Sequence, residues 1–76
     1  MPLTLSQLNK DVYCVLDHHG HHVGNLKRIN GLWKFKAIGY DTNGDIMPGW
    51  GPLTERHNTT FDTLDEVLVN RKLLSG

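Results

Sequence analysis

Residues 22–38 read His22-Val23-Gly24-Asn25-Leu26-Lys27-Arg28-Ile29, then Asn30-Gly31, then Leu32-Trp33-Lys34-Phe35-Lys36-Ala37-Ile38. Asn-Gly between two alternating runs is the strongest short-range signal of a β-hairpin. A two-residue loop also determines which side chains face one another across the two strands. It predicts the pairs Gly24 with Ala37, Leu26 with Phe35, Lys27 with Lys34, and Arg28 with Trp33.

A second hairpin is predicted before this one. The run from Val12 to Leu16 is rich in β-branched and aromatic residues, which favours a strand. Asp17-His18-His19-Gly20 is typical of a type I turn closed by a glycine bulge. With His18-His19-Gly20 as the loop, Leu16 lies beside His22, Cys14 beside Gly24, and Val12 beside Leu26. We therefore expect one apolar face that contains Val12, Cys14, Leu16, Leu26, Phe35 and Ala37.

The two ends of the chain each carry a capping-box pattern. Thr4-Leu5-Ser6-Gln7 predicts a short N-terminal helical turn. Thr63-Leu64-Asp65-Glu66 predicts the start of a C-terminal helix, with Asp62 or Thr63 as its cap. The helix is expected to cover the apolar face with Leu64, Val67 and Leu68.

Together these elements predict an α+β fold in a single small domain over residues 1–76. A three- to four-stranded antiparallel β-meander, whose short last strand is Asp45-Ile46-Met47, is packed on one face by the C-terminal helix. In this layout Phe61-Asp62-Thr63 leads into the helix. The layout resembles that of two kinds of small DNA-binding module, one found in plants and the other at the N-terminus of integrases. The resemblance concerns layout alone and implies a sheet that enters the major groove.

The composition of the chain excludes few classes of function. Eight Lys and Arg residues balance eight Asp and Glu residues, so net charge indicates neither a nucleic acid nor a membrane surface as partner. Cys14 is the one cysteine, so no intramolecular disulfide forms, and we expect a cytoplasmic protein. No apolar run approaches the ~20 residues of a membrane span, and no signal peptide is apparent at the N-terminus.

Local charge is more informative than net charge. Between Val23 and Tyr40 the chain has four basic residues and no acidic residue. The hairpin register places Lys27, Lys34 and Lys36 on the face opposite the apolar one, with Asn25 beside them. We therefore predict a non-enzymatic nucleic-acid-binding module in which the lysines contact phosphate, Asn25 reaches a base edge and Tyr13 stacks. A solvated face whose lysine stems extend into water is the alternative.

The other end of that face is apolar, and its predicted members are Val15, Val23, Ile38, Tyr40 and Ile46. Such a patch is unusual on a soluble monomer. Either the segment 48–58 folds over it, with Trp50 and Leu53 as plugs, or the patch and Trp50 form an interface with a protein partner or a second copy.

Other polar clusters do not converge on a reaction. His18, His19, His21 and His22 surround Gly20, but a tight turn directs their rings apart, so only incidental metal affinity is expected. Asp41-x-Asn43-x-Asp45 lacks the later ligands of a calcium loop. The acid, base and hydroxyl groups of Thr54-Glu55-Arg56-His57-Asn58 are adjacent in sequence and do not resemble a catalytic triad. We predict no catalytic residue, no functional metal site and no cofactor.

Overall fold

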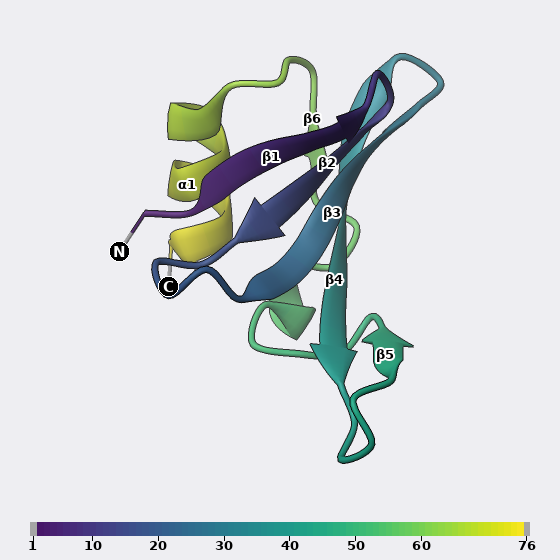
Figure 1. Cartoon of the computed structure of the whole chain (residues 1–76). Coiled ribbons are helices and arrows are strands. Elements are labelled where there is room, and N and C mark those ends of the chain that lie inside the picture. The colour runs from purple at the N-terminus through teal and green to yellow at the C-terminus, as the bar shows by residue number, and fades with distance from the viewer. Residues whose placement is uncertain (1, 76) are drawn as a thin grey trace.

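A computed structural model describes residues 2–75 of the chain, and it consists of one antiparallel sheet and one C-terminal helix (Figure 1). The elements are β1 (Thr4–Asn9), β2 (Val12–Leu16), β3 (His22–Ile29), β4 (Leu32–Tyr40), β5 (Ile46–Pro48), a 3₁₀ turn η1 (Thr54–Arg56), β6 (Thr60–Phe61) and α1 (Glu66–Leu74). The strand order is β1-β2-β3-β4-β5, and β6 also pairs with β4. The predicted α+β class is confirmed, but the predicted meander is smaller than the sheet.

The β3–β4 hairpin has the predicted register. Its turn residues Asn30 and Gly31 have φ angles of 52° and 80°, the left-handed values that an Asn-Gly loop accepts. Gly24 pairs with Ala37, Leu26 with Phe35, Lys27 with Lys34, and Arg28 with Trp33. From Trp33 to Ala37 the residues of β4 therefore alternate between buried and half-buried.

The β2–β3 hairpin departs from the prediction by one residue. Leu16 pairs with His22 as expected, but the register then shifts, and Val15 pairs with Gly24. Val23 is the extra residue of this β-bulge, and an extra residue reverses which face the rest of β2 presents. Val15 is consequently fully buried, whereas Val12, Cys14 and Leu16 are only half-buried on the opposite face, so their predicted place in the core is wrong.

The predicted N-terminal helical turn is also wrong, because residues 4–9 form the edge strand β1. Thr4 pairs with Leu16 and Ser6 with Cys14. Leu3 is buried, and Leu5 packs against the core. Two side chains of α1 accept hydrogen bonds from this edge: Asn70 from the Leu3 amide, and Glu66 from the Leu5 amide at 3.2 Å. The burial of Leu3, the partial burial of Leu5 two residues later, and the edge amides bonded by the helix outweigh the local capping signal.

The far edge of β4 is satisfied along its length. Trp33 pairs with Phe61 of β6, and Ile38 with Pro48 of β5. Between them the Phe35 amide donates to Thr59, its carbonyl accepts from Asn58, and the Ala37 carbonyl accepts from Gly49. The segment 48–61 thus follows β4 and makes it an interior strand.

The C-terminal helix begins later than the capping box predicted. Asp65 is its cap and accepts from the amides of Val67 and Leu68, so neither Asp62 nor Thr63 fills this role. Val69 and Leu73, four residues apart, form the buried stripe. Leu64 and Leu68 are partly buried beside it, but Val67 is 68% exposed, which corrects its predicted core position.

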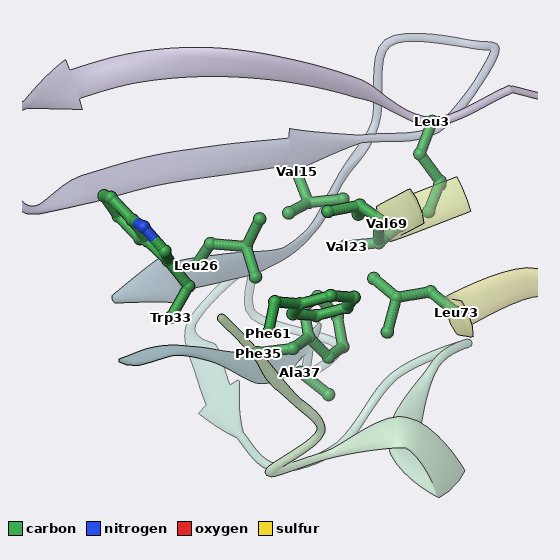
Figure 2. Packing of buried hydrophobic residues seen from close by; sticks show 10 residues of the cluster. All are labelled: Leu3, Val15, Val23, Leu26, Trp33, Phe35, Ala37, Phe61, Val69 and Leu73. Carbon is green, nitrogen blue, oxygen red and sulfur yellow. The ribbon is translucent and has the colours of Figure 1, made fainter. Parts of the chain in front are cut away.

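The hydrophobic core lies between the helix and the inner face of the sheet (Figure 2). Its members are Leu3, Val15, Val23, Leu26, Trp33, Phe35, Ala37, Phe61, Val69 and Leu73. Phe35, Phe61 and Leu26 are among the largest fully buried side chains, each stabilising the fold by roughly 1.5–3 kcal/mol. No helix among residues 2–75 covers the opposite, outer face of β3 and β4 (Figure 1), where Asn25, Lys34 and Lys36 are half-buried and Lys27 is exposed.

Candidate functional site

The outer face of β3 and β4 carries a group of basic and amide side chains, here called the lysine face: Asn25, Lys27, Lys34 and Lys36. Lys27 lies directly opposite Lys34, and Asn25 directly opposite Lys36. Because Leu26 and Phe35 between them point into the core, strand alternation directs all four side chains outward. The predicted grouping of these four residues on one face is therefore what the structure shows.

Among residues 2–75, no acidic side chain forms an ion pair with the lysine face. Within residues 2–75, Arg28 forms an ion pair with Asp11 at 2.7 Å, and His21 Nδ1 lies 3.6 Å from the Asp17 carboxylate. Neither includes a lysine of the lysine face. Like charges directly opposite each other on a sheet are destabilising. The Lys27–Lys34 pair therefore slightly lowers the free energy of unfolding.

Asn25 is held by a neighbour on the same strand. His22 donates its Nε2 proton to Asn25 Oδ1 at 2.8 Å, and Tyr40 contacts His22 Nδ1 at 3.5 Å. Asn25 Oδ1 therefore already accepts one hydrogen bond, whereas no hydrogen bond from the Asn25 NH₂ group is found within residues 2–75. The free NH₂ group of Asn25 can donate to a phosphate or to an acceptor on a base edge.

Tyr13 does not belong to the lysine face. It pairs with Leu26 on the inner face, and its ring stands edge-on to Trp33 with the centroids 5.5 Å apart. The bulge at Val23 is the reason, because it reverses the face of β2. The aromatic side chain on the outer face is Tyr40, which is 51% exposed and lies opposite Ile46.

A hollow of about 370 Å³, here called the outer hollow, opens beside the lysine face. Its lining is polar on one side and apolar on the other, and comprises Asn25, Lys27, Lys36, Ala37, Ile38, Ile46, Pro48 and His57. His57 Nδ1 accepts from the Ala37 amide at 3.0 Å, and Lys36 Nζ donates to Asn58 Oδ1 at 2.6 Å. Sequence reasoning missed His57 and Asn58, because no local pattern indicates that the segment 57–59 lies along β4.

The apolar patch predicted as an alternative interface is divided by the structure. Val15 and Val23 are buried in the core and Ile38 is 5% exposed, so none of these three offers an interface surface. Tyr40, Ile46 and Trp50 are exposed by 51%, 55% and 63%. The difference again follows from the bulge, which turns Val15 and Val23 inward.

The segment 48–58 was expected to cover the patch with both Trp50 and Leu53, but only Leu53 is packed. Leu53 packs against the core, whereas Trp50 remains exposed. Trp50 borders a cleft of about 670 Å³, here called the Trp50 groove, lined by Asp17, Gly20, His21, His22, Val23, Ile38, Gly39, Tyr40, Met47, Trp50, Gly51 and Pro52. The loop is held firmly, since Gly49 donates to Ala37 at 2.8 Å and the Thr54 hydroxyl donates to Gly49 at 2.6 Å.

The histidine-rich turn is organised by Asp17. Its Oδ1 accepts the amides of His19 and His21, both at 2.9 Å. The His21 amide, followed by the His19 amide, holds the pKa of Asp17 below its ordinary value of 3.8. Within residues 2–75 no three His, Cys, Asp or Glu side chains form a group that could hold a metal ion.

Comparison with known proteins adds no relative: no family model matches the chain, and neither curated proteins nor solved structures give a match. Among residues 2–75, no helix combines the length and the apolar character needed to cross a membrane. What this protein does must therefore be inferred from its own residues and their geometry.

Proposed function

We propose that this chain is a non-enzymatic nucleic-acid-binding module that uses the lysine face. One observation carries the proposal: Lys27, Lys34 and Lys36 share an open sheet face, and no carboxylate within residues 2–75 pairs with any of them. Phosphate contacts by lysine supply most of the affinity of non-specific nucleic-acid binding. A phosphate backbone would also relieve the repulsion between Lys27 and Lys34.

The salt dependence of binding tests the proposal. Labelled single- and double-stranded oligonucleotides are titrated with the protein by fluorescence anisotropy at several salt concentrations. If all three lysines touch phosphate, the triple variant K27A/K34A/K36A loses affinity, and the slope of log K against log salt becomes flatter by roughly three units on a duplex and by about two on a single strand.

A matched pair of double variants separates a local contact from general charge. K27A/K34A and K10A/R71A remove the same number of positive charges, and Lys10 and Arg71 are exposed side chains outside the lysine face. We expect only K27A/K34A to flatten the salt slope. Equal losses in the two variants, or no binding of the native protein at low salt, would refute the proposal.

A protein interface at the Trp50 groove is the second candidate function. The observation in its favour is that Trp50 is 63% exposed although its loop is held by several hydrogen bonds. Large aromatic side chains are enriched among the residues that dominate protein interfaces. A second copy of this chain is the partner tested most directly, by sedimentation velocity on the native protein, on W50S, and on L8S, whose leucine is 67% exposed elsewhere. Self-association that W50S abolishes and L8S preserves would support this candidate.

A further inference from the structure

The outer hollow presents mainly hydrogen-bond donors, because Asn25 Oδ1 and His57 Nδ1 each already accept a hydrogen bond from the protein. Asn25 Oδ1 accepts from His22, which leaves the Asn25 NH₂ group. Lys27 and Lys36 have only N–H donors, and the contact with Asn58 uses one of the three on Lys36. No carboxylate of residues 2–75 is among the lining residues. A site that offers donors and positive charge selects an anion.

His57 contributes a donor whose position is set by the backbone. The Ala37 amide can only donate, so His57 Nδ1 carries no proton and the ring proton of the neutral imidazole resides on Nε2. Nε2 makes no hydrogen bond within residues 2–75, and no buried side-chain nitrogen of these residues lacks a partner. The Nε2 proton is therefore accessible from solvent and free to bind a ligand oxygen.

The other side of the hollow is apolar. Ile38 and Ile46 line it, and Ile46 is 55% exposed. Tyr40 pairs directly with Ile46 across β4 and β5, so its ring extends the apolar surface beyond the hollow. A volume of about 370 Å³ lies within the range of small-molecule sites. The ligand that matches this division has an anionic group attached to a flat apolar ring.

We propose that the outer hollow binds one phosphate group of a nucleotide, whose sugar and base lie over Ile46 and Tyr40. A base that stacks on a side chain must be free of duplex pairing, so the ligand class is single-stranded nucleic acid. This inference rests on the proposed function for the origin of the phosphate. The hydrogen-bond donors of the hollow do not depend on that function, and they would bind the phosphate of a free nucleotide equally well.

Chemical-shift mapping on the native protein tests the site without any variant. The side-chain amide of Asn25 and the ring of His57 are followed by NMR during titration with inorganic phosphate, thymidine monophosphate, a single-stranded oligothymidine and a duplex of equal length. We expect all phosphate ligands to shift both side chains, with the single strand binding most tightly. Shifts confined to other residues would overturn the proposal.

Two variants test the two sides of the hollow. N25D keeps the shape of Asn25 but introduces a carboxylate, and N43D makes the same change in the exposed β4–β5 turn. We expect N25D to weaken single-strand binding at least tenfold and N43D less than twofold. Y40L removes stacking, which is worth about 1–3 kcal/mol per base, so single-strand affinity falls about tenfold while inorganic phosphate affinity is retained.

The outcomes distinguish this inference from the proposed function. If N25D and N43D behave alike while K27A/K34A still weakens oligonucleotide binding, the hollow proposal fails and the nucleic-acid function stands. If phosphate and the mononucleotide shift Asn25 and His57 but no oligonucleotide binds, the hollow is an anion site and the nucleic-acid function fails. If the duplex binds as tightly as the single strand, the assigned ligand class is wrong.

Discussion

The two hairpins that share β3 differ in how far their turns determine the pairing. In the β3–β4 hairpin, the turn at Asn30-Gly31 is followed by regular pairing from Ile29–Leu32 to Gly24–Ala37. In the β2–β3 hairpin, the predicted turn and its first pair, Leu16 with His22, are present, but Val23 then interrupts the pairing. A turn thus sets the register only as far as the first bulge.

The β-bulge at Val23 is stabilised by the side chains that it places in the core. With Val23 as an extra residue, both Val15 and Val23 enter the core, and their exposed fractions are 0% and 3%. Regular pairing would instead direct Cys14 inward beside Gly24. The core therefore gains two β-branched side chains in exchange for one disrupted rung of the ladder.

Truncation of Phe35 is the strongest test of the regular hairpin. Phe35 is fully buried opposite Leu26, so F35A should destabilise the protein by about 3–5 kcal/mol and is expected to unfold much of it at ambient temperature. Urea denaturation followed by Trp fluorescence measures the change. K36A, one residue further on the outer face, should alter stability by under about 0.5 kcal/mol. Similar losses in both variants would show that β4 has been assigned the wrong face.

Truncation within β2 tests the bulged hairpin. V15A removes two methyl groups from a fully buried site and should cost about 2 kcal/mol, whereas C14A should cost less than about 1 kcal/mol because Cys14 is half-buried. The same denaturation experiment compares the two variants. If C14A proved the more damaging change, the regular register without the bulge would be correct.

Glycine substitution compares the two turns themselves. Gly31 and Gly20 have φ angles of 80° and 82°, and a Cβ added at either would meet no atom within 4 Å. G31A and G20A should therefore each cost about 1 kcal/mol, from backbone conformation alone. Thermal melts of both variants measure this. A much larger loss for either one would point to contacts beyond the turn.

Acid should act on one turn and leave the other unchanged. The folded-state pKa of Asp17 is lowered from 3.8, so its stabilising contribution is fully present above that value and is lost as pH falls through the lower folded-state pKa. Backbone NMR between pH 2 and 7 should show His19 and His21 losing their turn geometry before Asn30 and Gly31 do. D17N, which keeps the amide acceptor without the charge, should flatten this pH dependence. Simultaneous loss of both turns would contradict the local role of Asp17.

In the candidate site, as in the fold, the features set by the Asn-Gly turn were predictable and those set by tertiary contacts were not. The grouping of Asn25, Lys27, Lys34 and Lys36 follows from the Asn-Gly turn and strand alternation, so it was predictable. The position of Tyr13 depended on β2 and was predicted wrongly. The donors supplied by His57 and Asn58 depend on a loop that crosses β4, and their sequence neighbourhood carries no signal of that contact.

What the sequence determined by itself is the part of the molecule governed by local geometry: the α+β class, the central hairpin and the opposite characters of its two faces. Only the tertiary structure decided the face of β2, the conversion of residues 4–9 into an edge strand, and the late start of the C-terminal helix. In β2 every residue from Val12 to Leu16 is apolar or aromatic, so a period of two cannot show which face is buried. Packing in the core resolves that ambiguity, because the observed register places Val15 and Val23 in one cluster with Val69 and Leu73 of the helix.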